Sequence, residues 1–180
     1  MIYNYKRCSK KYKNRYEINK KIEGGILRKI GRNLYTDSLD DSELFLISSK
    51  YPNAVFTLRS AFYYQGLTDT IPDYYYLLTD KDSSKIQDDS VKQYFDNSNS
   101  LSLGKETKIY NGTKIKVFNK ERLLVELIRN KNKLSFDYYK EIILNYRKII
   151  SELDISLIEK YASKLPKSKL VLRTISLEIL

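Results

Sequence analysis

The densest apolar and aromatic content of the chain lies in its middle, at residues 51–80 (YPNAVFTLRSAFYYQGLTDTIPDYYYLLTD), and turn-forming residues divide this stretch. Its opening Tyr-Pro-Asn predicts a turn, because proline fixes φ and disfavours a helical residue before it. A short buried strand is expected at residues 54–56, followed by a helix with Thr57 as N-cap and Gly66 as its end. An aromatic-rich strand is expected at residues 74–79. This spacing predicts one compact α/β unit, with its aromatic residues in the core rather than in a ligand pocket.

Two further strand signals follow the central stretch. Residues 107–110 and 113–118 flank Asn111-Gly112, a strong signal for a two-residue β-hairpin turn. Residues 91–95 alternate as a strand. Two polar stretches between these strands, residues 80–90 and residues 96–104, are expected to be loops. Weak structure is expected in residues 96–104.

From residue 119 onward the apolar period becomes helical. Asn119, Ser135 and Asp154 are expected N-caps of three helices, and apolar residues follow each of them at three- and four-residue spacing. A last apolar segment, residues 168–180, is expected to be helical and is a candidate for self-association. Strands followed by helices predict an α+β domain.

The N-terminal residues 1–36 predict two short helices and a β-hairpin. In the first helix Ile2, Tyr5, Cys8 and Tyr12 would share one face. A break at Lys13-Asn14-Arg15 precedes the second helix, residues 16–23, which Gly24-Gly25 ends; strands are expected at 26–30 and 34–36 around a Gly-Arg-Asn turn. This order predicts a minimal winged helix-turn-helix, in which the second helix enters the major groove and the hairpin contacts phosphates or the minor groove. A full winged helix has a further helix before these two.

Charge is concentrated in the same 36 residues. The chain has a net charge of +11, and residues 1–36 hold eleven Lys/Arg against two acids, which is +9. A protein that is basic at one end indicates a polyanionic partner. The alternative is a solvated basic face on a small structural subdomain. The cations expected to contact DNA are Lys10, Lys11, Lys13, Arg15, Lys20, Lys21, Arg28, Lys29 and Arg32.

The pattern YPNAVFTLRSAFYYQGLTDTIPDYYYL, preceded by GGILRKIGRNLYTDS, resembles the AbiEi-type antitoxin family. The resemblance runs from about Tyr12 to the C-terminus. It implies a bacterial transcription regulator with an N-terminal winged helix, paired with a nucleotidyltransferase toxin in abortive infection systems. The expected function is that of a DNA-binding antitoxin and autorepressor that binds duplex DNA upstream of its own operon. The cognate toxin is expected as a functional partner; since toxin and antitoxin of that family are usually thought not to form a stable complex, direct contact is not assumed.

Composition restricts catalytic chemistry. The chain has no histidine and one cysteine, Cys8, which excludes histidine-based triads and histidine-based metal sites. The alternative to a non-catalytic regulator is a Mg²⁺-dependent nuclease or nucleotidyl-transferring enzyme. It would use Asp73 with Glu106 and Lys108, in the pattern PD…(D/E)xK, or the pair Asp80 and Asp82.

The expected organisation is therefore a winged helix-turn-helix module at residues 1–36, an acidic connector at 37–42, and a mixed α/β domain at 43–180 whose helical segment begins at 119. No cofactor is expected. The absence of a signal-peptide pattern and of a long apolar run predicts a cytoplasmic protein that contacts no membrane. A homo-oligomer is possible through the C-terminal segment.

Overall fold

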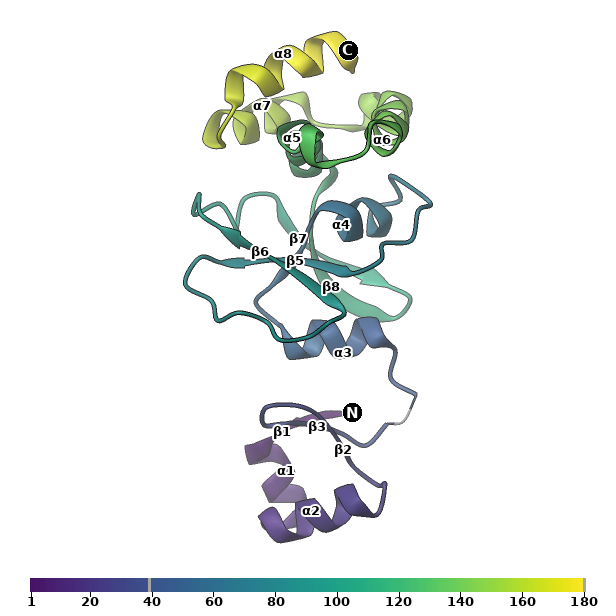
Figure 1. Cartoon of the computed structure of the whole chain (residues 1–180), viewed down its shortest axis with the longest axis vertical. Helices are drawn as coiled ribbons and strands as arrows, with labels where there is room; N and C mark the ends of the chain where they lie inside the picture. The colour runs from purple at the N-terminus through teal and green to yellow at the C-terminus, as the bar shows by residue number, and fades with distance from the viewer. Residues whose placement is uncertain (39, 180) are drawn as a thin grey trace. The chain divides into compact units, whose positions relative to one another are not determined.

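The computed structural model describes residues 1–38 and 40–179, and it shows an α+β protein (Figure 1). The chain divides into two compact units, Met1–Pro52 and Asn53–Leu180. The first unit contains the predicted module of residues 1–36, the predicted connector and one more helix. Leu39, within the predicted connector, and Leu180, at the end of the last predicted helix, lie outside the described residues.

The N-terminal unit consists of short strands and helices, and polar residues mark the starts of its helices. Asn4 starts the first helix, because its side-chain oxygen accepts a hydrogen bond from the Arg7 backbone N–H at 2.9 Å. Lys13, with φ of 71°, separates the two helices, and Asn14 caps the second one in the same way. Its elements are β1 (Ile2–Asn4), α1 (Tyr5–Tyr12), α2 (Arg15–Glu23), β2 (Arg28–Gly31), β3 (Leu34–Thr36) and α3 (Glu43–Lys50).

The three strands of this unit form one antiparallel sheet in the order β1-β3-β2. The prediction that Ile2 lies on a helical face was wrong, since Ile2 pairs with Thr36 in β1. Sequence periodicity did not reveal this strand because its pairing partner is more than thirty residues away. The predicted hairpin is confirmed, although its first strand begins at Arg28 and leaves Ile26 outside it with 53% of its surface exposed.

A small core holds the N-terminal unit together. It consists of Tyr3, Cys8, Ile18, Leu27 and Tyr35, with Tyr12 and Ile22 packed against it. Residues of strands β1 and β3 and of helices α1 and α2 contribute to this core. The two helices are therefore packed against the sheet. Cys8 is fully buried, and burial raises the pKa of its thiol.

The second unit is a five-stranded mixed sheet followed by a helical segment. The strand order is β6-β5-β4-β8-β7, with the pairs β5–β6 and β4–β8 parallel and the other two antiparallel. Its elements are β4 (Val55–Phe56), α4 (Leu58–Tyr64), β5 (Tyr75–Asp80), β6 (Val91–Asp96), β7 (Lys105–Tyr110), β8 (Thr113–Phe118), α5 (Lys120–Arg129), η1 (Lys131–Lys133), α6 (Phe136–Ile149), η2 (Ile150–Glu152), α7 (Ile155–Lys164) and α8 (Ser168–Glu178).

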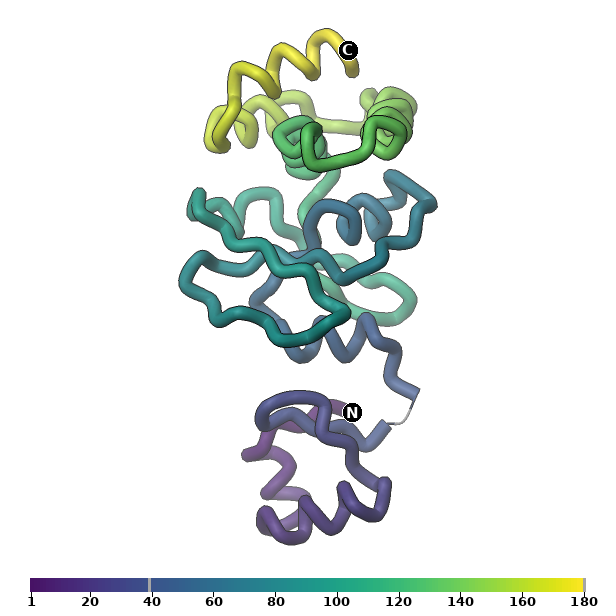
Figure 2. Tube along the Cα trace, in the orientation of Figure 1, coloured from purple at the N-terminus to yellow at the C-terminus, as the bar shows by residue number. Residues whose placement is uncertain are grey.

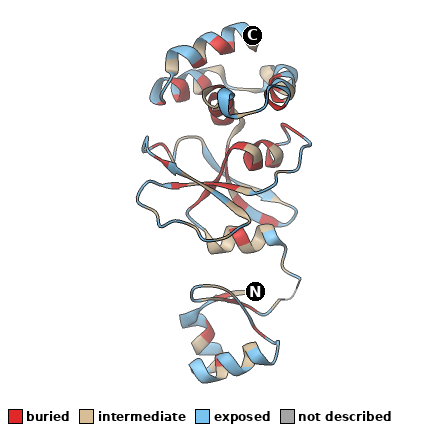
Figure 3. Ribbon diagram, in the orientation of Figure 1, coloured by how far each residue is buried: buried red, intermediate tan, exposed pale blue. Residues whose placement is uncertain are grey.

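Within this unit α4 and the helices α5 to α8 lie on one side of the sheet (Figures 1 and 2). The buried positions gather on the central strands β4 and β8, along α4, and on all sides of α5, which is buried from Arg122 to Ile128 (Figure 3). Phe62, Phe118, Leu124 and Tyr146 are among its fully buried side chains. The core therefore lies between the sheet and the helices.

Most turn and cap predictions for this unit are confirmed. Asn111 and Gly112 have φ of 45° and 75°, the left-handed pair that the two-residue hairpin requires. Asn119 and Asp154 cap their helices through side-chain oxygens. Thr57 and Ser135 occupy the predicted N-cap positions, but neither side chain makes a capping hydrogen bond, so that part of the prediction was wrong.

The loop before β7 is more ordered than expected. The Asp96 carboxylate accepts hydrogen bonds from the backbone N–H groups of Ser98 and Ser100 and from the Ser100 hydroxyl. Ser100 in turn accepts a hydrogen bond from the buried Arg122 at 3.1 Å. The prediction of weak structure at residues 96–104 was therefore wrong, because a carboxylate at the end of β6 organises the loop.

Candidate nucleic-acid interface

Helix α2 presents one polar face to solvent. Ile18 is fully buried in the core of the N-terminal unit, which turns the opposite side of the helix outward. Tyr16, Asn19 and Lys20 are exposed on that side, with 73% of the Tyr16 surface accessible, and Arg15 is exposed beside Asn19, closer to the face of Ile18. Positions 15 and 19, and positions 16 and 20, are each one turn apart, so these four side chains form a continuous strip.

The predicted DNA-contacting cations lie on both helices and on the hairpin. Lys21 is half-buried, whereas the other eight are exposed. In the described parts of the chain, the side chains of eight of the nine make no ion pair or hydrogen bond: Lys10, Lys13, Arg15, Lys20, Lys21, Arg28, Lys29 and Arg32. Unpaired exposed cations keep their full charge available for a phosphate.

Lys11 is the exception among these cations. Its ammonium donates hydrogen bonds to the Tyr3 hydroxyl at 2.7 Å and to Asp37 Oδ2 at 3.1 Å. The hydrogen bond to Tyr3 is the largest of several contacts that raise the pKa of Lys11. Asp37 also accepts from the N-terminal ammonium and from Tyr3, both at 2.6 Å. Lys11 therefore ties α1 to the residue that follows β3, and less of its charge is available to a ligand.

The hairpin carries its cations along β2 and at its turn. Arg28 and Lys29 are exposed on β2, and Arg32 is exposed in the turn between the strands. The pairing of β2 with β3 shifts register between Lys29 and Gly31. Such an irregularity increases the local twist of a hairpin and redirects its tip. The backbone carbonyl of Asn33 accepts from the Tyr5 N–H at 2.9 Å, which fixes this turn to the start of α1.

The residues of the nuclease alternative do not converge. Glu106 and Lys108 lie on β7, and both contact Gln65: Nε2 of Gln65 donates to Glu106 at 2.6 Å, and Lys108 donates to Oε1 of Gln65 at 3.0 Å. Asp73 lies two residues before β5, and strands β4 and β8 separate β5 from β7. Two intervening strands correspond to roughly 14 Å between the outer two, at about 4.8 Å per strand. These carboxylates therefore cannot share one metal ion.

The other acidic pair has a local structural role. Asp80 Oδ1 accepts a hydrogen bond from the Asp82 backbone N–H at 3.0 Å, which closes the turn after β5. Among the residues that the structure describes, no group of three or more acidic or thiol side chains is placed to hold a metal ion.

Sequence inspection missed two features that the structure brings forward. Tyr16 and Asn19 join the exposed strip of α2, and the four-residue spacing to Lys20 and Arg15 would have indicated it. In α5, Arg122 and Glu126 are buried together, although only the leucines and isoleucine of that helix were predicted to face inward. An Arg and a Glu four residues apart inside an apolar helix was the available signal.

Comparison of the chain with known proteins finds no matching family model and no similar curated protein. Among the described helices, none combines the length and apolar character that a membrane-spanning segment requires.

Proposed function

We propose that this protein is a non-catalytic, DNA-binding transcription regulator whose N-terminal unit contacts duplex DNA. The observation that carries the proposal is the set of eight unpaired cations on α1, on the turn after it, on α2 and on the hairpin, within a segment of net charge +9. A cation without a partner inside the protein breaks no ion pair when it binds a phosphate. Each neutralised phosphate also releases a condensed counterion, which favours binding.

The topology supports a winged helix-turn-helix interpretation. The order strand, helix, helix, strand, strand, with the first strand pairing along β3, leaves α2 exposed beside a β-hairpin. A helix and a hairpin at neighbouring positions can bracket a groove, with the helix in the major groove and the wing on phosphates or in the minor groove. In this protein only strand β1 precedes the two helices. A full winged helix has a further helix at that place.

The exposed strip of α2 provides both phosphate contacts and base contacts. Lys20 and Arg15 are suited to phosphates or to guanine, and Asn19 to adenine. Tyr16 adds a large aromatic surface with a hydroxyl donor beside them. Arg32 at the hairpin turn suits a narrow minor groove, where negative potential is strongest.

The antitoxin part of the proposal rests on the sequence resemblance. It makes the upstream region of the protein's own operon the target. A cognate nucleotidyltransferase toxin is then a functional partner, and no direct contact with it is required.

The test is a titration of fluorescent DNA from that upstream region, followed by anisotropy. Replacing Lys20 and Lys21 with Ala should weaken binding, and Arg32→Ala should cost about 1–3 kcal/mol if Arg32 enters a narrow minor groove. Lys81→Ala with Lys85→Ala is the matched control, since both lysines are exposed in the loop after β5. Loss of binding in the control, with binding kept in the Lys20, Lys21 and Arg32 variants, would overturn the proposal.

A further inference from the structure

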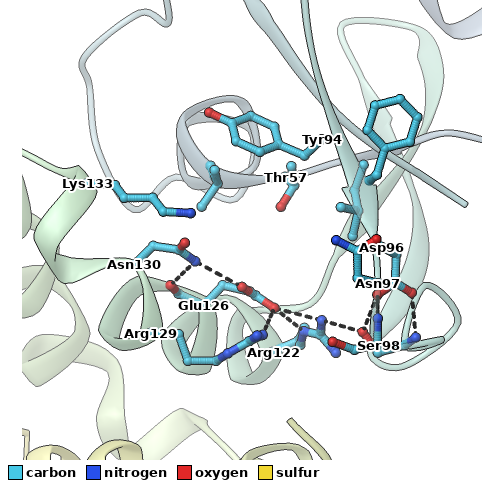
Figure 4. A pocket seen from close by; sticks show the side chains of 14 residues that line it. Thr57, Tyr94, Asp96, Asn97, Ser98, Arg122, Glu126, Arg129, Asn130 and Lys133 are labelled. Atoms are coloured by element: carbon cyan, nitrogen blue, oxygen red, sulfur yellow. Dashed lines mark hydrogen bonds and ion pairs between the residues drawn. The ribbon is translucent and has the colours of Figure 1, made fainter. Parts of the chain in front are cut away.

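The second unit contains a polar cavity of about 270 Å³ that the proposed DNA contact does not use (Figure 4). It lies between the ends of β5 and β6, the start of α4, and helix α5 with the following turn. At roughly 30 Å³ for each water of the liquid, this space equals about nine waters, enough for a small molecule.

The carboxylates of the cavity are already saturated. Glu126 Oε1 accepts from Arg122 Nε at 3.0 Å, from Arg122 Nη2 at 2.7 Å and from Arg129 Nη1 at 2.8 Å. Its Oε2 accepts from the Asn130 amide at 3.1 Å. Asp96 accepts three hydrogen bonds from its own loop. A carboxylate offers about four acceptor sites, so little acceptor capacity remains for a ligand.

Donors, in contrast, are left over. Nη1 of Arg122 and Nε of Arg129 have no hydrogen-bond partner among the described residues, but both atoms are closed to solvent, so they add positive charge to the cavity wall and are not donors that a ligand can reach. Lys133 makes no ion pair in the part of the chain that the structure describes, and the Thr57 hydroxyl forms no capping bond. In Figure 4 the Lys133 ammonium and the Thr57 hydroxyl both point into the space over Glu126 and Asn130.

Charge and backbone geometry agree with this excess of donors. Three cations and two carboxylates line the cavity, which leaves one positive charge in excess. Leu58, which also lines it, has φ of 45°, a left-handed conformation that is unfavourable for a bulky residue. Strained residues of this kind cluster where a ligand is bound.

We propose that this cavity binds a small molecule through a phosphate group, with Lys133 and Thr57 as its donors and Arg129 adding positive charge. A phosphate presents only acceptors and negative charge, which complements a site whose own acceptors are filled. The proposal is independent of DNA binding, since every residue that lines the cavity belongs to the second unit.

The test uses the full chain with glycerol 3-phosphate as probe and glycerol as its uncharged counterpart, at constant ionic strength. Isothermal titration should detect the phosphate ester and not glycerol. Lys133→Ala should weaken binding at least about tenfold, because a hydrogen bond to a charged group is lost. Thr57→Val keeps the side-chain shape and should weaken binding less.

Two controls separate this site from other lysines. Lys160→Ala changes an exposed lysine on α7 away from the cavity and should bind like the unaltered protein. Lys20→Ala with Lys21→Ala should also bind the probe normally, which distinguishes this site from the proposed DNA surface. Unchanged affinity in both Lys133→Ala and Thr57→Val, or loss of affinity in the Lys20, Lys21 variant, would overturn the assignment.

Discussion

At the scale of single residues, charged side chains have different roles according to how far they are buried. Arg122 is almost fully buried, and burial lowers the pKa of its guanidinium while Glu126 opposes that shift. Glu126 holds Arg122 and Arg129 together through one oxygen, so a single carboxylate compensates two cations. Exposed cations such as Lys20 and Arg32 have no such partner among the described residues.

Removing the shared carboxylate should be costly. Glu126→Ala removes the ion-pair partner that two guanidinium groups share, and breaking a buried pair in this way typically costs about 3–5 kcal/mol. Urea unfolding followed by circular dichroism measures the change. Glu159→Ala, which removes an exposed carboxylate on α7, should stay within about 0.5 kcal/mol. Equal effects for the two variants would contradict the structural role of Glu126.

Asp37 should make the stability of the N-terminal unit sensitive to acid. Hydrogen bonds from the N-terminal ammonium and from Tyr3 hold the pKa of Asp37 well below its usual range. A carboxyl whose folded pKa is depressed stabilises the fold above its unfolded pKa of about 3.9, and this contribution is lost as pH falls further toward the folded pKa.

The difference in melting temperature between the unaltered protein and Asp37→Asn should therefore be largest above about pH 5 and shrink as pH falls toward about 2. Thermal unfolding at several pH values measures it. A difference that grows on acidification would show that Asp37 does not act through its charge.

At the scale of elements, turns and helix starts could be predicted from a few neighbouring residues, because their geometry depends on those residues alone. Asn111-Gly112 predicts the hairpin, and Asn119 and Asp154 predict helix starts, because each acts on its own neighbours in the chain. Strand β1 could not be predicted, since Ile2 fits a helical face equally well and only its pairing with Thr36 makes it a strand. The ordering of residues 96–104 could have been predicted in part, because Asp96 acts on Ser98 and Ser100 in its own loop, whereas the contact of Ser100 with the distant Arg122 could not.

The junction between that loop and α5 should tolerate no side chain at Gly104. A Cβ there would lie 2.6 Å from Cβ of Arg122 and 2.8 Å from Oδ1 of Asn119, the N-cap of α5. Gly104→Ala should therefore cost more than Gly66→Ala. Both glycines have φ of 70°, but nothing lies within 4 Å of a Cβ at Gly66.

Gly66→Ala should lower the free energy of unfolding by about 1–2 kcal/mol, the cost of placing a Cβ on a left-handed backbone. Urea unfolding of the two variants compares them directly. Equal destabilisation would mean that the loop moves away from α5 without cost.

At the scale of the whole molecule, the chain consists of two compact units with different chemistry. The first has a small core and a surface of unpaired cations, whereas the second has the larger core and the donor-rich cavity. The concentration of lysine and arginine in residues 1–36 indicated the cationic surface of the first unit, because lysine and arginine side chains are usually exposed. The cavity could not be predicted, because its lining comes from segments between Thr57 and Lys133 that only the fold brings together.

The salt dependence of DNA binding shows whether cations of the N-terminal unit contact the phosphates. With roughly four to six phosphate contacts and a slope of about −0.9 for each, log K against log salt should have a slope of about −4 to −5. Replacing Lys20, Lys21 and Arg32 together with Ala should make the slope less steep by up to about 2.7, while Lys81→Ala with Lys85→Ala should leave it unchanged. A triple variant that keeps both the affinity and the slope of the unaltered protein would contradict DNA binding through the N-terminal unit.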